Sequence, residues 1–467
     1  MPESRSLHPL YWPIAALRAA YARGELSPAQ VLEDALARLT TFNPRLNAFL
    51  CTLEQLAGEQ AISAGKAYRN GTAGPLAGIP ISIKDTFDIS GAVSTRGSLV
   101  YRAHVAQADS GAVRRLRAAG ALFVGKTNTA EFGQSATTDN RLGGDCRNPW
   151  NVSRTPGGSS GGAAASVAAG IVTAALGADG GGSIRIPAAF TGLVGIKPTY
   201  GLCRDEGGFP AMSDFCCPGP LAWRVADARI MLSVLSERQL TRSKMKAPLR
   251  VAWCPRPEGR PVDPGLAGVV ASAARQLSAL GHEVEEVDVP VAGWKEAFGP
   301  LVLEEEGRLR GHLLRDCRDM LTGYEAAALD AAASLDVSSV MDAREQCRIF
   351  QARIDAFLTR YDVIATPTTA VTAFPVGERP RMIAGEPVDA LWGAFPFTAA
   401  FNVAGTPAAS IPCGFIDGLP AGLQLVCARG RDALLLDIAE ALEECLHIDV
   451  STIQRRFASE RAAEVAT

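Results

Sequence analysis

Residues Thr155 to Thr199 read TPGGSSGGAAASVAAGIVTAALGADGGGSIRIPAAFTGLVGIKPT, and this stretch decides how the rest of the chain is interpreted. It contains two glycine-flanked serine clusters, which place Ser159 and Ser183 24 residues apart. Glycine is used where a side chain would block a close backbone approach. We therefore predict two loops that direct backbone N–H groups and hydroxyls at something small. A plainer alternative, two turns that only join a helix to a strand, stays open on this stretch alone.

The composition excludes several classes of function. The chain has 467 residues, a net charge of −3, 47% hydrophobic and 20% charged residues. These values are ordinary for a globular protein with a substantial core and give no electrostatic reason to expect binding to nucleic acid or to a membrane. The eleven cysteines are scattered, and no CxxC or HExxH motif and no signal peptide pattern occurs. We therefore expect a cytoplasmic protein with reduced thiols and with no metal or other cofactor.

Apolar residues recur in patterns that predict alternating helices and strands. LAGIPISIK (76–84) alternates isoleucine with other residues, which predicts a strand. Ser27 and Pro28 are typical of a helix start, and we expect that helix to end before Asn43 and Pro44. Further helices are each expected to precede a short strand: 109–119 before 121–124, 265–280 before 282–287, and 342–359 before 363–365.

This alternation predicts the fold class, which is α/β with one large mixed, mostly parallel β-sheet covered by helices on both faces. No linker-like tract interrupts the sequence, so we expect a single domain over residues 1–467. Residues 285–345 are more polar and helical in pattern. We interpret them as an insertion that covers a substrate pocket.

Two matches to known catalytic motifs fail on their context. Residues 120–127, GALFVGKT, fit the pattern of a phosphate-binding loop, but Gly120 ends a predicted helix and a strand pattern follows. Residues 157–161 fit G-x-S-x-G, the nucleophile elbow of the α/β-hydrolases. The sequence before them, RNPWNVSRTP, is loop-like rather than a strand, and the three later histidines stand in ordinary settings. We therefore set both motifs aside.

Lys84 is the base that the sequence offers instead. It ends the isoleucine strand, and burial there would lower its pKa because burial disfavours the charged form. A neutral lysine can accept a proton from a serine hydroxyl. Three glycines precede Ser183, so their N–H groups could receive the oxyanion that forms when Ser183 attacks a carbonyl. Ser159 would relay the proton. For Lys84 alone, a side chain that only reaches solvent from the strand end stays an alternative.

Several further motifs follow one another in a characteristic order: GIPISIKD (78–85), VGKTNTAEFG (124–133), the glycine/serine stretch, PTYG (198–201), PGPLAWRVADA (218–228), DVIATPT (362–368), FTAAFNVAGTPAASIPCG (397–414) and LPAGLQLV (419–426). Together they resemble the amidase signature family over most of the chain. The resemblance implies the amidase signature fold, with a core at about residues 76–228.

The resemblance also implies a serine–cis-serine–lysine triad, in which Lys84 is the base, Ser159 the cis-serine and Ser183 the acylated nucleophile. Around this triad it implies an oxyanion hole, substrate-contacting main chain and supporting residues. The implied oxyanion hole consists of Gly180, Gly181 and Gly182. The implied substrate-contacting residues are Gly133 and Gln134, and the implied supporting residues are Ser160, Asp179 and Arg185.

The implied function is hydrolysis of C–N bonds in small amides through a serine acyl-enzyme, with aryl esters or carbamates as further substrates. The expected partner is a small-molecule amide, and a homodimer stays open. The alternative is a glutaminase-type A subunit of a tRNA-dependent amidotransferase. Such subunits usually carry an acidic DSTS-like segment where this chain reads SERQLTRSKMKAP (236–248), which argues against that role. A non-catalytic scaffold is disfavoured because Lys84, Ser159 and Ser183 are all present.

Two features depart from the family pattern. Gly180 stands where many relatives have threonine, and we expect it to open room in the pocket. The pair Cys216–Cys217 also replaces a different stretch, and the sequence assigns it no chemical role. We expect the segments 206–217, 294–344 and 380–396 to set specificity. The candidate pocket walls within them are Phe209, Met212, Trp392 and Phe395.

Overall fold

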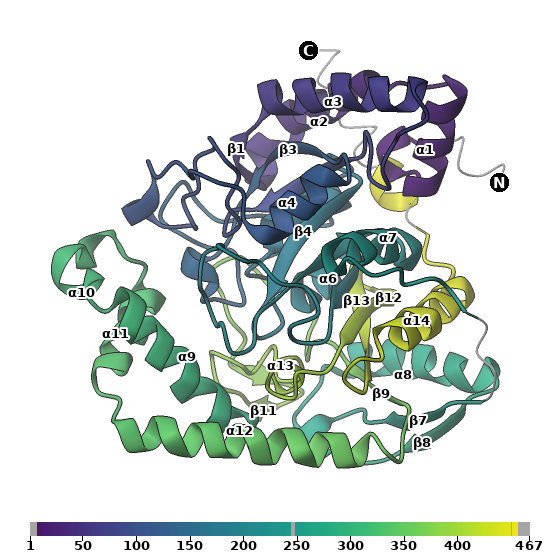
Figure 1. The fold of residues 1–467 in the computed structure, drawn as a ribbon. Helices are drawn as coiled ribbons and strands as arrows, with labels where there is room; N and C mark the ends of the chain where they lie inside the picture. The colour runs from purple at the N-terminus through teal and green to yellow at the C-terminus, as the bar shows by residue number, and fades with distance from the viewer. Residues whose placement is uncertain (1–6, 244–247, 450, 456–467) are drawn as a thin grey trace.

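The computed structural model describes residues 7–243, 248–449 and 451–455, and its centre is an 11-stranded sheet (Figure 1). The strands follow in this spatial order: β1 (Phe49–Thr52), β3 (Leu122–Thr127), β2 (Pro80–Lys84), β4 (Ala174–Asp179), β6 (Cys217–Ala222), β5 (Val194–Lys197), β12 (Ala408–Ile416), β13 (Leu419–Cys427), β9 (Val363–Pro367), β7 (Arg250–Trp253) and β8 (Glu283–Glu286). A separate pair consists of β10 (Met382–Ile383) and β11 (Glu386–Pro387).

The expected large mixed sheet with helices on both faces is confirmed. Parallel pairing occurs in two blocks, β3–β2–β4 and β9–β7–β8. Between the blocks, β6, β5, β12 and β13 are joined by antiparallel pairs, because β12 and β13 form a hairpin and β6 runs against both of its neighbours. Antiparallel pairing in the centre is therefore more extensive than the helix–strand pattern of the sequence predicted.

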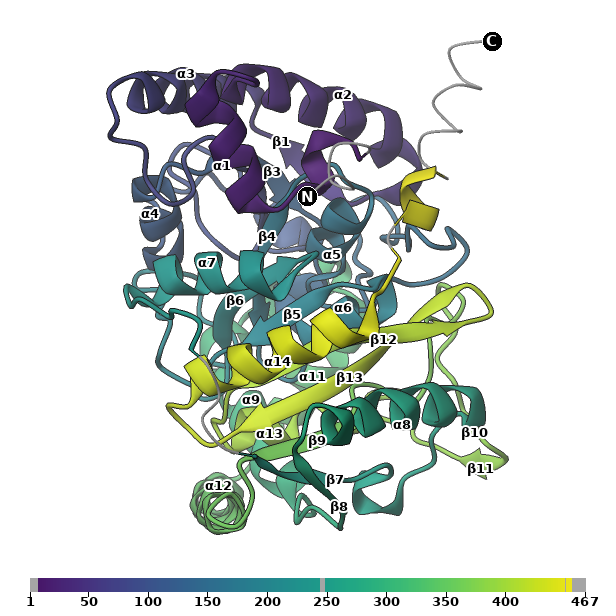
Figure 2. The ribbon, with the colours of Figure 1, turned by 90° about the vertical axis from the view of Figure 1, so that its right-hand side faces the viewer.

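Helices cover both faces of this sheet (Figure 2). One face carries α5 (Gly161–Ala168) and α6 (Arg185–Thr191), and the other carries α7 (Val225–Ser236), α8 (Pro264–Ala279) and α14 (Asp432–Leu446). The remaining helices are α1 (Ile14–Arg23), α2 (Pro28–Leu46), α3 (Glu54–Arg69), α4 (Gly111–Ala118), α9 (Trp294–Arg310), α10 (Leu313–Asp316), α11 (Gly323–Ala333), α12 (Val337–Phe357) and α13 (Ala400–Val403). In the part of the chain that the structure describes, no helix combines the length and the apolar character that a membrane crossing needs.

Helix α2 begins as predicted but ends later than predicted. The Ser27 hydroxyl accepts from the Gln30 N–H at 3.2 Å, and the Gln30 side chain accepts from the Ser27 N–H at 2.9 Å, which is a capping box. The helix then continues past Pro44 to Leu46 and ends at Asn47, which has a left-handed conformation. Because Pro44 lies in the last turn, its missing N–H removes only one hydrogen bond and does not stop the helix.

The segment expected to be an insertion forms α9, α10 and α11 and the start of α12, which lie together at one side of the molecule (Figure 1). Helix α9 links this group to the loops of the core. Glu305 accepts from the Ser213 N–H at 2.7 Å, and Glu306 accepts a short hydrogen bond from the Gln134 side chain. Both carboxylates are buried. The insertion therefore holds two loops that reach the cavity described next.

Candidate active site

A cavity of about 530 Å³ lies where the C-terminal ends of β2 and β4 meet. Parallel neighbouring strands bring their carboxyl ends to one edge of a sheet, which is where α/β folds place ligands. Lys84 ends β2, and residues 180–183 follow directly after β4. Lys84, Ser159 and Ser183 all line this cavity. The residues that the sequence placed in separate motifs are thus brought to one site.

Lys84 contacts Ser159 directly. Lys84 Nζ donates a hydrogen bond to Ser159 Oγ at 2.7 Å, and the side chains are 2% and 1% exposed. Burial lowers the pKa of Lys84 to about 8, although Cys216 and Asp179 oppose this shift electrostatically. The peptide bond between Gly158 and Ser159 is cis, in agreement with the cis-serine that the resemblance implies. A lysine with this pKa has a substantial neutral fraction near pH 8 and can take a proton from Ser159.

Ser160 ties the two serine loops together. Its N–H donates to the Ser183 carbonyl at 3.2 Å, and its hydroxyl donates to the Ala178 carbonyl at 3.2 Å. Ser160 Oγ also lies 3.3 Å from the Ala178 N–H, which donates to it. The loop that carries Ser159 is therefore fixed to the end of β4 and to the residue that the sequence identifies as the nucleophile.

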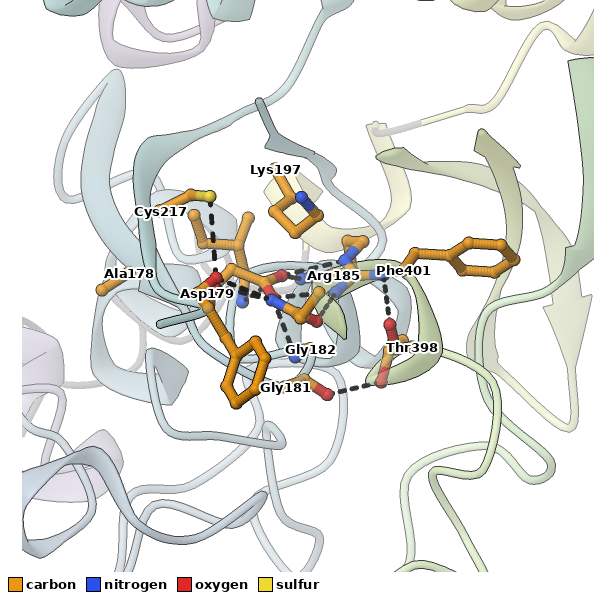
Figure 3. Close-up of polar contacts among 12 residues, drawn as sticks. Ala178, Asp179, Gly181, Gly182, Arg185, Lys197, Cys217, Thr398 and Phe401 are labelled. Carbon is orange, nitrogen blue, oxygen red and sulfur yellow. Dashed lines mark hydrogen bonds and ion pairs between the residues drawn. The ribbon is translucent and has the colours of Figure 1, made fainter. Parts of the chain in front are cut away.

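The glycine loop is held by the carboxylate of Asp179. Gly182 N–H donates to Asp179 Oδ1 at 2.8 Å, and the Gly181 carbonyl accepts from Thr398 Oγ1 at 2.8 Å (Figure 3). A Cβ atom at Gly182 would lie 2.2 Å from Thr398 Oγ1, and its φ is +127°, so only glycine fits there. The peptide between Gly181 and Gly182 is thus clamped at both its carbonyl and its N–H.

This clamp occupies one of the three glycine N–H groups that the resemblance places in the oxyanion hole. The Gly182 N–H is used by Asp179 and so is not available to a ligand. Within residues 7–243, 248–449 and 451–455, no acceptor is paired with the N–H groups of Gly180, Gly181 or Ser183. Gly180 also lines the cavity. Among the described residues, these three N–H groups therefore have no acceptor, whereas the N–H of Gly182 has one.

Asp179 and Arg185 form an ion pair with no solvent exposure. Arg185 binds Asp179 through Nε at 2.9 Å and through Nη2 at 2.8 Å. Its remaining N–H groups donate to the Thr398 carbonyl and to the side chains of Gln424 and Asn402. Burial alone would raise the pKa of Asp179, but the Arg185 guanidinium holds it well below its usual range. Asp179 is therefore ionised at neutral pH, and its carboxylate anchors the glycine loop.

Of the two expected substrate-contacting residues, only Gly133 lies at the cavity. A Cβ atom at Gly133 would be 3.5 Å from Ser159 Oγ and 3.9 Å from Lys84 Nζ. The N–H groups of Gly133 and Gln134 are both used within the local turn, by the carbonyls of Ala130 and Glu131. The Gln134 side chain points to Glu306 of α9. Neither of these N–H groups is therefore free to bind a ligand.

Comparison with known proteins identifies the family, because a family model described as Amidase matches residues 30–436. The chain belongs to the amidase family. The A subunit of the glutamyl-tRNA(Gln) amidotransferase of Symbiobacterium thermophilum is 33% identical over 472 residues, covering 92% of this chain and 96% of that protein. Indoleacetamide hydrolase of Bradyrhizobium diazoefficiens is 36% identical over 458 residues, covering 92% of this chain and 86% of that protein. A crystal structure of an amidase matches with a TM-score of 0.88 at 32% identity, covering 93% of this chain and 100% of that one.

The motifs set aside at the sequence level have other uses in this amidase. Residues Leu122–Thr127 form β3, and Lys126 is buried in an ion pair with Asp85 at 2.7 Å. Residues 120–127 therefore do not form a phosphate-binding loop. In the described part of the chain, no histidine lines the cavity beside Ser159, so the elbow interpretation has no base.

The predicted pocket walls divide into two groups. Phe209 and Met212 line the cavity, as expected. Phe395 does not, because it is fully buried in the core against Phe190 and Phe374. Trp392 packs against aromatic residues of α9 and is not part of the cavity wall.

Cys216, which the sequence left without a role, lines the cavity near Lys84. Burial raises the pKa of its thiol to about 12 although Lys84 lowers it. The thiol is therefore protonated at neutral pH and is a weak nucleophile. Cys216 therefore packs at this wall of the cavity.

Three positioning residues were missed at the sequence level. Thr398 and Asn402 lie in FTAAFNVAGTPAASIPCG, and Gln424 lies in LPAGLQLV. The order of the motifs alone predicts no role for the polar residues inside these mostly apolar segments. A polar side chain within an apolar run that is expected to be buried needs a hydrogen-bond partner, and that signal could have identified them. Here the partner is Arg185 or the glycine loop.

Replacing Thr398 by valine is expected to reduce kcat about 10- to 100-fold. The peptide between Gly181 and Gly182 would lose the anchor of its carbonyl, and the neighbouring N–H groups would then lose their fixed orientation. KM should change little, since the clamp does not contact the ground-state substrate. Thr398→Ser keeps the hydroxyl and should restore most of kcat. Steady-state kinetics of the three proteins tests this, and an unchanged kcat in Thr398→Val would show that the clamp has no catalytic role.

Proposed function

We propose that this protein is an amidase that hydrolyses small amides through an acyl-enzyme on Ser183. The observation that carries the proposal is the buried hydrogen bond of 2.7 Å between Lys84 Nζ and Ser159 Oγ, in a cavity that Ser183 also lines. A buried lysine of lowered pKa next to a serine is an activated base for a second serine. Family membership supports the reaction class, and the geometry supports these residues.

The reaction proceeds in two steps. Ser183 Oγ attacks the amide carbonyl carbon while its proton passes through Ser159 to the neutral Lys84. The oxyanion is stabilised by the N–H groups of Gly180, Gly181 and Ser183. The C–N bond then breaks and the relay returns the proton to the departing amine. Water next attacks the acyl-enzyme by the same proton route and regenerates Ser183. Esters and carbamates can follow the same acyl-enzyme route.

The alternative is the A subunit of a tRNA-dependent amidotransferase, a name that the relative from Symbiobacterium thermophilum shares with several other relatives of this chain. The segment 236–248 lacks the acidic sequence of those subunits, although its residues 244–247 lie outside the described structure. Its described part is bound to α14, where Arg242 pairs with Glu444 at 2.7 Å and Ser243 Oγ donates to Asp437 at 2.6 Å. The remaining predictions, a cytoplasmic location and a homodimer, stay predictions.

Hydrolysis by the purified chain alone distinguishes the two functions. We expect release of amine or ammonia from members of a panel of simple alkyl and aryl amides without any added protein. The Ser159→Ala variant, in which the proton relay is broken, should hydrolyse no amide of this panel. Turnover of glutamine alone, and only in the presence of partner subunits, would instead support the amidotransferase function.

The pH dependence of kcat/KM is expected to rise to a plateau with a midpoint at about 8, which is the pKa of Lys84. The sign follows from the role of this group: below its pKa the lysine is protonated and cannot accept the proton of Ser159, and above it the base is neutral. An amide substrate without titratable groups isolates this ionisation. A profile that is flat from about pH 6 to pH 10 would contradict Lys84 as the base.

A further inference from the structure

The sequence suggested that Gly180 opens room in the cavity. The structure shows instead that the Met212 side chain fills that space. An ideal Cβ atom at Gly180 would lie 2.5 Å from Met212 Sδ, 3.1 Å from its Cβ and 3.3 Å from its Cγ. The methionine side chain therefore lies directly on the Cα of Gly180. It occupies the space that a side chain at position 180 would take.

The segment that carries Met212 is fixed from outside the catalytic elements. The Met212 carbonyl accepts hydrogen bonds from the N–H groups of Phe215 and Cys216, each at 2.8 Å. The next residue, Ser213, is held by Glu305 of α9, and Phe215 stacks on Phe298 of the same helix with ring centroids 5.1 Å apart. The insertion thus holds Met212 over the glycine loop, while β4 and Asp179 hold the loop itself.

Met212, Gly180 and Ser183 line one cavity, and the Gly180 N–H has no acceptor among the described residues. A carbonyl oxygen bound to that N–H places the carbonyl carbon and its substituents beside the Met212 side chain. We propose that Met212 determines specificity by limiting the acyl group, so that amides with an unbranched carbon next to the carbonyl are accepted and branched ones are rejected. This inference rests on the proposed function, since it assumes acylation of Ser183.

Labelling with two sulfonyl fluorides tests the inference without knowledge of the natural substrate. Ethanesulfonyl fluoride and propane-2-sulfonyl fluoride differ by one methyl group on the carbon attached to sulfur, and both transfer the sulfonyl group to an activated serine with loss of fluoride. Intact-protein mass spectrometry gives the labelling rates, each divided by the reagent's rate of hydrolysis in buffer. One methyl group more or less in a close-fitting pocket changes the relative reaction rates of two such compounds by about 10- to 200-fold.

The wild-type protein is expected to prefer the ethyl reagent at least about tenfold, and Met212→Ala should reduce that preference to roughly twofold or less. Met212→Leu keeps most of the volume and should retain the preference. Met341→Ala is the matched control, because Met341 on α12 is 67% exposed. Gly180→Ala competes for the space of Met212 and should slow both reagents, and the double variant Gly180→Ala/Met212→Ala should recover them. If Met212→Ala does not fold, Met212→Val carries the same test.

The outcomes separate the inference from the proposed function. An adduct on Ser183 with the same reagent preference in wild type and Met212→Ala would overturn the role of Met212 and leave the nucleophile established. The absence of any adduct on Ser183 in the wild type would overturn the proposed function, and the inference with it. A reduced preference in Met212→Ala, but not in Met341→Ala, supports both.

Discussion

Replacing Ser183 by alanine is expected to reduce kcat for amide hydrolysis by about 10⁶-fold. The serine supplies the oxygen that forms the acyl-enzyme, and alanine leaves only the oxyanion donors and substrate binding. The fold should be unaffected, because the Ser183 side chain makes no hydrogen bond within the described structure. The main-chain carbonyl of residue 183 still accepts from the Ser160 N–H in the variant. Kinetics under single-turnover conditions measures the loss.

Ser338→Ala is a matched control for this change. Ser338 is exposed at the start of α12, and its hydroxyl donates to Asp336 and to no other side chain in the described residues, so its replacement should leave kcat within roughly twofold. Circular dichroism and the unfolding midpoint should be alike for wild type and both variants. Residual activity above about one per cent in Ser183→Ala would mean that another group attacks the amide.

Replacing Arg185 by methionine is expected to lower the free energy of unfolding by about 3–5 kcal/mol. The substitution leaves the Asp179 carboxylate fully buried without its cation, and it also leaves the Gln424 side chain and the Thr398 carbonyl without this donor. The glycine loop would lose its anchor at the same time, so kcat should fall as well. Urea-induced unfolding, followed by tryptophan fluorescence, gives the change in stability.

A surface pair provides the comparison for Arg185. Arg318 binds Asp330 at 2.6 Å, but the side chains are 56% and 51% exposed, so Arg318→Met should cost about 0–1 kcal/mol. The double variant Arg185→Met/Asp179→Leu removes both buried charges and should recover part of the stability, although not the activity. Equal stability losses for Arg185→Met and Arg318→Met would contradict the view that the buried charge of Asp179 dominates.

The local elements of the core were predictable because each carries its own signal. The isoleucine alternation before Lys84 identified β2, and the Ser27–Pro28 pair identified the start of α2. The glycine clusters around Ser159 and Ser183 indicated two functional loops, and both line the cavity. These signals depend on neighbours in sequence, which a single chain displays directly.

What the sequence did not predict depends on contacts between distant residues. The use of the Gly182 N–H by Asp179, the clamp of Gly181 by Thr398 and the position of Met212 over Gly180 each need a tertiary neighbour. Phe395 was a candidate wall because it is aromatic, yet an aromatic residue is as suitable for the core. The direction of the central strands likewise follows from pairing between distant strands and not from the sequence of each strand.

Mass spectrometry of the intact protein after reaction with a fluorophosphonate probe tests the central claim, which is that Ser183 is the nucleophile and Lys84 its base. The account predicts one adduct per chain, mapped to Ser183 by peptide sequencing. The adduct should be absent in Ser183→Ala and should form far more slowly in Ser159→Ala and Lys84→Ala. An adduct on Ser159, or an unchanged labelling rate in Lys84→Ala, would contradict the account.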